Sequence, residues 1–206
     1  MGFAQGGISY KTYYVKGDLP ADYRQLFLDR IRLHAFTPLT VDSEEDITYG
    51  WTPIEDLLET NFQTPAVFLN QYIVLSLRLD RWAIPPALLK AAVRRAEQEF
   101  REETKRDYLS RTERGEILER ERNELKKQAL PAVRAIDMYW NIDTGQLRFG
   151  SASRSVNEQF IDMFERTFSL ELIPDSPYIS AVQCGLDGEL IGQLADLTPA
   201  NLVGDN

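Results

Sequence analysis

The feature that most constrains this fold is a charged segment, residues 85–131, which contains one glycine and separates two regions of mixed strand and helix pattern. In its first half, apolar residues recur at spacings of four, three and four, the period of an α-helix. These residues are Leu89, Val93, Ala96 and Phe100. The pattern predicts a helix with one narrow apolar face.

The second half of the segment carries its own helix start signal. Ser110 and Glu113 have the capping-box spacing, in which each side chain accepts a hydrogen bond from the other residue's backbone N–H. Pro131 ends the helix because proline has no N–H to donate. The expected apolar face is formed by Ile117 or Leu118, then Leu125 and Ala129. We therefore predict a helical hairpin over residues 85–134.

The charge of this hairpin differs from that of the rest of the chain. Residues 90–134 hold 13 Lys/Arg and 10 Asp/Glu, whereas the remaining residues hold 10 and 22, out of 23 and 32 in the whole chain. One interpretation is a solvated surface helix held by i,i+4 ion pairs, such as Glu102 with Arg106 or Glu97 with Arg101. The other interpretation is a basic surface that an acidic body presents to a polyanion.

The composition limits the class of protein. A chain of 206 residues with 43% hydrophobic residues can bury a core as one domain or as two closely packed ones. The single cysteine, Cys184, excludes an intramolecular disulfide and indicates a reducing compartment. No apolar run approaches the ~20 residues of a membrane span. We expect a cytoplasmic protein that does not enter a membrane.

The region before the hairpin reads as strand, helix, strand, strand. Residues 8–15, 47–51 and 68–79 have strand patterns, and the last is apolar on both faces, as expected of a central strand. Asp18 is the expected cap of a helix that continues to Leu33. Residues 52–65 are compatible with a loop or with one helical turn.

The region after the hairpin reads as strand, strand, helix, strand. Residues 136–142 and 146–150 are joined by a turn at Gly145, and a helix capped by Ser153 or Ser155 precedes a strand at 170–173. We predict an α+β fold: an antiparallel sheet built from two β/α halves, with helices on one face and the hairpin inserted.

The expected organisation has four parts. Residues 1–84 form the first half, 85–134 the hairpin, and 135–178 the second half that completes the same domain, followed by a tail at 179–206. Apolar residues in this tail fit a short helix or a hairpin, and they are Leu186, Leu190, Ile191 and Leu194. We expect residues 1–7 and the last residues to be disordered.

Several chemistries lack the residues they need. His34 is the only histidine, so zinc sites of the Cys₄ or Cys₂His₂ type are excluded, and we expect no cofactor. No phosphate-binding glycine motif occurs. A carboxylate metal site of a nuclease is weakly suggested by Asp175 and by the run from Glu124 to Lys126. We interpret the acidic run 42–46 as a solvated loop.

Six short sequences, in their order and spacing over about residues 8–177, resemble the recombination-associated RdgC proteins of bacteria. They are Ala35-Phe36-Thr37-Pro38, Gly50-Trp51-Thr52-Pro53, Ile84-Pro85-Pro86, Leu130-Pro131-Ala132-Val133-Arg134, Trp140-Asn141-Ile142-Asp143 and Leu172-Ile173-Pro174. The family has a further C-terminal portion, so the resemblance implies a shortened member.

The resemblance implies a non-catalytic, nucleoid-associated homodimer that binds double-stranded DNA with little sequence preference and restrains a recombinase. The hairpin would then project toward DNA. Charge clustering, rather than any family motif, selects its phosphate contacts: Lys90, Arg94, Arg95, Arg101, Lys105, Arg106, Lys126 and Lys127. Two alternatives stay open: an acidic protein–protein interaction module of a recombination or replication system without DNA binding, and a metal-dependent exonuclease.

Overall fold

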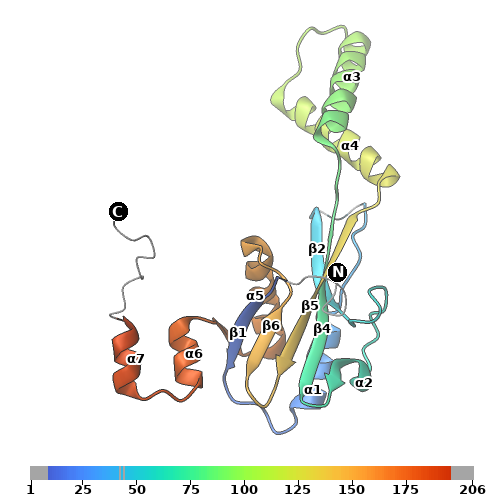
Figure 1. Ribbon diagram of the computed structural model, residues 1–206. Coiled ribbons are helices and arrows are strands. Elements are labelled where there is room, and N and C mark those ends of the chain that lie inside the picture. Colours follow the sequence, from blue (N-terminus) through green and yellow to red (C-terminus); the bar gives the residue numbers. More distant parts are fainter. Residues whose placement is uncertain (1–8, 42, 44, 196–206) are drawn as a thin grey trace, which may run out of the picture.

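The computed structural model describes residues 9–41, 43 and 45–195, so the expectations for both extreme ends lie outside the described residues. One seven-stranded sheet dominates the body of the molecule (Figure 1). Its strands are β1 (Lys11–Lys16), β2 (Ile47–Thr52), β3 (Phe68–Leu69), β4 (Tyr72–Arg81), β5 (Ala132–Asn141), β6 (Gln146–Phe149) and β7 (Glu171–Pro174).

The two halves of the chain share this sheet. The strand order is β2-β4-β5-β6-β1-β7, with β3 also paired to β4, and every pairing between these strands is antiparallel. Strand β1 comes from the first half, yet it lies between β6 and β7 of the second half. The expected α+β class with an antiparallel sheet is therefore confirmed, and the two halves interleave.

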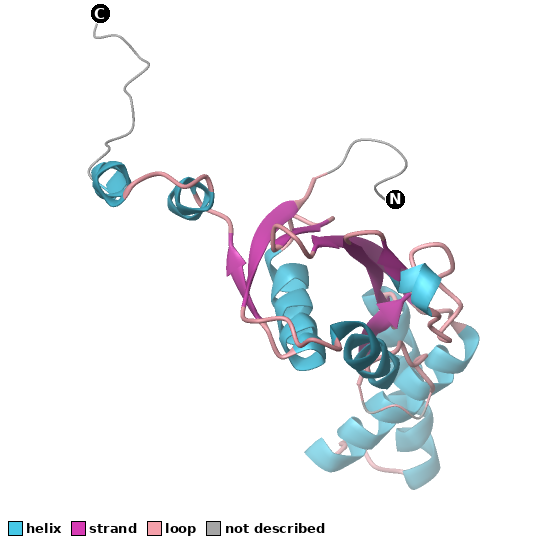
Figure 2. Cartoon of the chain, turned by 90° about the horizontal axis from the view of Figure 1, so that it is seen from below, coloured by secondary structure: helices cyan, strands magenta, loops and turns pink. Residues whose placement is uncertain are grey.

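Two amphipathic helices cover one side of the curled sheet, as expected (Figure 2). They are α1 (Tyr23–Leu33) and α5 (Arg154–Phe168). Two hydrogen bonds between buried side chains tie α5 to the sheet: the Tyr13 hydroxyl donates to Asn157 at 2.6 Å, and the Trp51 indole N–H donates to Thr167 at 2.9 Å. These bonds satisfy polar groups that would otherwise be costly to bury.

The hairpin leaves the sheet after β4 and returns to it at β5. It consists of α3 (Pro86–Thr104) and α4 (Arg111–Gln128), and it projects beyond the end of the sheet (Figure 1). Strands β4 and β5 pair over ten residues each, from Tyr72 opposite Asn141 to Arg81 opposite Ala132. The longest ladder of the sheet therefore supports the projecting helices.

The chain after β7 forms two short helices, α6 (Pro177–Gln183) and α7 (Gly188–Ala195), beside the edge of the sheet (Figure 1). Of the two forms expected for the apolar residues of the tail, the short helix is found, because Leu190, Ile191 and Leu194 lie on α7, whereas α6 was not expected. Exposed apolar side chains lie on both helices, Tyr178, Val182 and Leu190, and in the connection between them, Leu186.

Three local expectations were wrong or left open. Residues 68–79 are not one strand, because Asn70 adopts a left-handed conformation (φ 54°) and reverses the chain between β3 and β4. Helix α1 begins at Tyr23 after Asp22, and not at a cap on Asp18. The undecided segment 52–65 is mostly loop and leads into the single turn α2 (Thr64–Val67).

Candidate nucleic-acid interface

The hairpin has a small hydrophobic interior of its own. Ala96 on α3, Leu109 in the connection and Ile117 on α4 are buried together, and Val93 and Phe100 pack against them. The predicted face of α3 therefore packs against α4, but of the predicted α4 face only Ile117 belongs to this cluster, and Leu118 is exposed. The residues of the cluster are not free to pair with a second hairpin.

The tip of the hairpin is fixed by the predicted capping box. The Ser110 hydroxyl accepts from the Glu113 backbone N–H at 3.2 Å, and the Glu113 carboxylate accepts from the Ser110 N–H at 2.8 Å. Arg106 also donates to this carboxylate. The Ser110 backbone N–H, and then Arg106, lower the pKa of Glu113 from 4.5 to about 2. The carboxylate is thus charged at physiological pH and holds the start of α4.

The base of the hairpin is held by Asp46, which lies just before β2. Its carboxylate forms ion pairs with Arg122 and with Lys126, the latter at 3.0 Å between Oδ1 and Nζ. Its backbone carbonyl accepts from the N–H of Trp82, the residue that follows β4. One residue therefore connects the body to both ends of the hairpin. This corrects the expectation that residues 42–46 only form a solvated loop, because Asp46 is an anchor.

Six of the eight expected phosphate contacts are exposed on the hairpin, and three of these six differ from the others: Lys90, Arg94 and Lys105. The structure shows no hydrogen bond or ion pair for their side chains within its described part. Lys90 and Arg94 are four residues apart on α3 and lie on one side of that helix. Lys105 follows the helix in a left-handed conformation (φ 52°) at the tip.

Four other side chains that were expected to contact phosphate form ion pairs with carboxylates of the hairpin. Arg95 pairs with Glu99 at 3.0 Å, and Lys127 pairs with Glu124 at 2.6 Å. The expected Glu97–Arg101 pair is confirmed at 3.5 Å. Arg106 pairs with Glu113 instead of Glu102. These four cations are partly neutralised by their neighbours.

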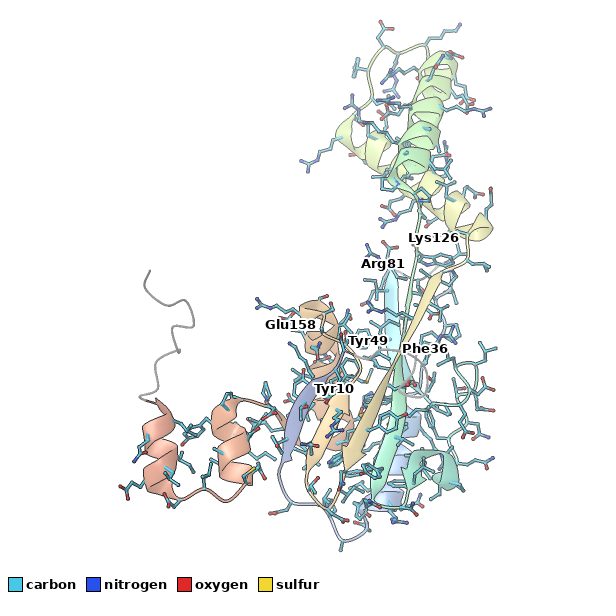
Figure 3. The ribbon with its side chains drawn as sticks, in the orientation of Figure 1. Tyr10, Phe36, Tyr49, Arg81, Lys126 and Glu158 are labelled. Carbon is cyan, nitrogen blue, oxygen red and sulfur yellow. The ribbon has the colours of Figure 1, made fainter. Side chains whose placement is uncertain are left out.

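Lys126 needs a correction, because its side chain is only 5% exposed and is bound to Asp46. Figure 3 shows it at the end of the hairpin nearest the sheet. It stabilises the junction and does not offer its charge to solvent. Four exposed cations of residues 90–134 were missed, Arg111, Arg114, Arg120 and Arg134, of which Arg120 is paired with Glu121. The charge count that selected the others includes them, so charge clustering could have found them.

The residues considered for other chemistries are dispersed. Asp175 accepts from the Ser180 hydroxyl beyond β7, whereas Glu124 pairs with Lys127 on α4. Within the described ranges, no group of three or more His, Cys, Asp or Glu residues is arranged to hold a metal ion. His34 caps the end of α1, where its carbonyl accepts from the Trp51 N–H.

No protein-family model matches the chain, and no curated protein matches it. Among the helices formed by residues 9–41, 43 and 45–195, none is sufficiently long and apolar to cross a bilayer.

Proposed function

We propose that this protein binds double-stranded DNA without sequence preference through its projecting hairpin, and that it acts in DNA recombination in the manner of the RdgC proteins it resembles. The observation that carries the proposal is a group of exposed hairpin cations without a carboxylate partner in the described chain. These are Lys90, Arg94, Lys105, Arg111 and Arg114. Phosphate oxygens are suitable partners for them.

The projection of the hairpin explains how an acidic protein can approach a polyanion. Helix α3 has 19 residues. At ~1.5 Å per residue it extends about 28 Å, which is several times the ~8 Å Debye length at physiological salt. The negative charge of the body is therefore largely screened at the tip, where Lys105, Arg111 and Arg114 lie, and less so at Lys90 and Arg94 in the first half of α3. Since Asp46 fixes the base, the cations stay on a defined arm.

The test is a duplex-binding titration at several salt concentrations with two unrelated sequences. The triple variant K90Q/R94Q/K105Q should weaken binding to both duplexes, and the slope of log K against log salt should fall by about 0.9 for each phosphate that is no longer neutralised. The matched control K16Q/R154Q/R166Q removes the same charge from exposed ion pairs on the body. It should bind like the unaltered protein. Equal weakening by both variants, or no binding at low salt, would refute the proposal.

The proposed homodimer needs a contact surface outside the hairpin interior, because that interior is already packed. The exposed apolar side chains of α6 and α7, among them Tyr178, Val182 and Leu190, supply such a surface. Light scattering should give a dimer mass that Val182→Asp reduces to the monomer mass. A monomer mass for the unaltered chain at tens of micromolar would exclude the dimer.

A further inference from the structure

The side of β4 opposite the helices carries a buried ion pair that positions a loop. Arg78 donates to Asp80 through Nε at 2.9 Å and through Nη2 at 2.7 Å, and its guanidinium lies 4.1 Å from the centroid of the Phe36 ring. The remaining nitrogen, Nη1, donates to the Leu57 carbonyl at 2.8 Å. The loop between β2 and α2 is thereby held over this side of the sheet.

The same loop is fixed at its other end and within itself. Arg32 of α1 donates to the carbonyl of Phe62, whose side chain is fully buried. The Asp56 carboxylate accepts from the Leu58 N–H at 2.8 Å, and the Glu59 carboxylate accepts from the Thr60 N–H at 2.9 Å. A loop held by this many contacts is preorganised, which lowers the cost of binding a ligand against it.

Between this loop and the sheet lies a cavity of about 640 Å³. Leu69, Val74 and the Tyr139 ring line it, together with Pro53 and Pro65. Ile54 and Ala66 add to this apolar lining, and the other lining residues are polar, among them three carboxylates, from Glu55, Asp56 and Glu59. No lysine or arginine of the described chain lines it. The cavity thus combines an apolar lining with an acidic one.

This combination selects a particular ligand chemistry. The carboxylates of Asp56 and Glu59 each use one oxygen for the loop, while the side chain of Glu55 has no hydrogen-bond or ion-pair partner in the described structure. They do not converge as metal ligands do. Burial, and then the charge of Asp137, raise the pKa of Tyr139, so its phenol is neutral. A neutral aromatic ring attracts cations.

We propose that this cavity binds an arginine or lysine side chain of an extended basic peptide, presented by a partner protein. The methylene groups of such a side chain fit against Leu69 and Val74, and its charged end fits among the carboxylates of Glu55, Asp56 and Glu59. This site lies on the body and uses none of the hairpin cations. It is therefore a protein-interaction site that is separate from the proposed DNA contact.

The probe is a capped tripeptide, acetyl-Leu-Arg-Leu-amide, compared with its neutral counterpart acetyl-Leu-Gln-Leu-amide. The arginine peptide should shift the backbone amide NMR signals of Ile54, Ala66 and Tyr139 in the ¹⁵N-labelled full chain, and the shifts should saturate. The neutral peptide should bind roughly tenfold more weakly, given the usual strength of cation–π contacts and exposed ion pairs. Equal binding of both peptides, no saturation, or shifts confined to other residues would each overturn the proposal.

Two variants localise the site. Glu55→Gln removes one carboxylate that makes no contact within the loop, and Tyr139→Leu removes the ring. Each variant should bind the arginine peptide roughly threefold to tenfold more weakly than the unaltered protein does. Glu158→Gln, an equal charge change on α5, is the matched control and should bind the peptide normally. Duplex binding should be retained by Glu55→Gln, so failure of this proposal and failure of the DNA proposal are distinguishable. Unchanged peptide affinity in both cavity variants would refute the site.

Discussion

The body and the hairpin are stabilised in different ways. Among the described residues, 24 buried hydrophobic side chains form one cluster in the body, whereas three form the cluster in the hairpin. The hairpin instead depends on a capping box, on ion pairs along its helices and on Asp46 at its base. Since hydrophobic burial contributes most of the stability of a folded domain, the hairpin is the part expected to open first.

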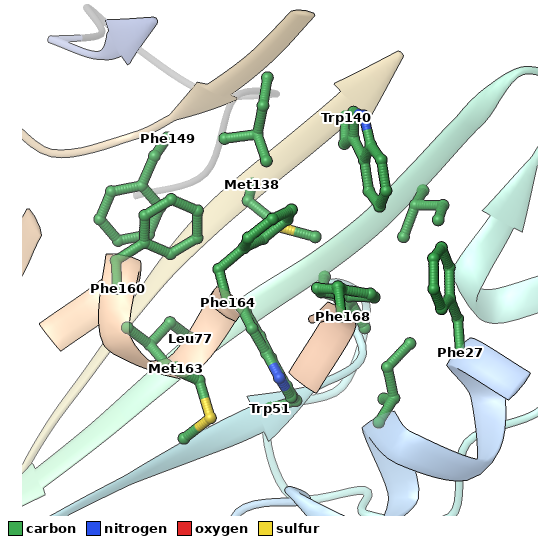
Figure 4. Packing of buried hydrophobic residues seen from close by; sticks show 14 of the residues in the cluster. Phe27, Trp51, Leu77, Met138, Trp140, Phe149, Phe160, Met163, Phe164 and Phe168 are labelled. Carbon is green, nitrogen blue, oxygen red and sulfur yellow. The ribbon is translucent and has the colours of Figure 1, made fainter. Parts of the chain in front are cut away.

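Ten of the 24 buried side chains in the interior of the body are aromatic, and several of their rings lie close together (Figure 4). Phe149 and Phe160 stack with ring centroids 3.9 Å apart. Phe164 contacts Trp140 at 5.4 Å and Phe168 at 4.7 Å between centroids. These contacts join α5 to β5 and β6, so that a change to one ring affects several elements.

The largest expected difference between the two regions comes from removing one buried side chain from each. Phe164→Ala should lower the free energy of unfolding of the body by about 3–5 kcal/mol, the usual cost of such a cavity. Ile117→Ala should leave the main denaturant midpoint in place and should speed hydrogen exchange only within α3 and α4. Circular dichroism and native-state hydrogen exchange measure the two effects. If Ile117→Ala shifted the main midpoint as far as Phe164→Ala, the hairpin and the body would be one cooperative unit.

The next effect concerns the junction between the two regions. Asp46→Ala leaves Lys126 buried without its partner, which is costly for a charged group. Because Asp46 is partly exposed, we expect Asp46→Ala to lower the free energy of unfolding by about 2 kcal/mol. This loss is smaller than the loss expected for a fully buried ion pair. Hydrogen exchange near Lys126 at the end of α4 should accelerate, while exchange in β5 beyond the junction should not.

A matched control for the junction is Glu124→Ala, which removes the partner of Lys127 from an exposed pair. It should change stability by less than about 0.5 kcal/mol. Similar acceleration in both variants would mean that Asp46 is an ordinary surface residue. If Asp46→Ala abolished duplex binding while the hairpin cations were intact, the direction of the arm would matter as well as its charge.

Strong local signals predicted part of the fold. The capping box of Ser110 with Glu113 follows from spacing, and so does the turn at Gly145, where φ is 68°. The reversal at Asn70 was missed because only Asn70 and Gln71 interrupt an otherwise apolar run that suits a strand, and asparagine is a weaker sign of positive φ than glycine. The interleaving of β1 between β6 and β7 depends on pairing over more than 130 residues, which periodicity cannot show.

The candidate site was predictable in part. Counting charge identified the basic segment, and Lys90, Arg94 and Lys105 are exposed there as expected. Burial of Lys126 was not predictable, because it follows from a contact with Asp46, eighty residues earlier in the chain. The acidic cavity was missed for a related reason, since its carboxylates come from one loop whereas Val74 and Tyr139 come from two strands.

The smallest expected effect is a local response to acid at the hairpin tip. Glu113 has a folded pKa of about 2, below its ordinary 4.5. The stability that Glu113 gives to the start of α4 is therefore fully present above pH 4.5, and it is lost as the pH falls toward 2. A carboxyl NMR titration should give a midpoint near 2 for Glu113. Arg106→Gln should raise that midpoint but keep it below 4.5, because the Ser110 N–H still donates to the carboxylate. A midpoint of 4.5 in the unaltered protein would show that the capping box does not form in solution, and the hairpin would then lack one of the contacts that compensate for its small interior.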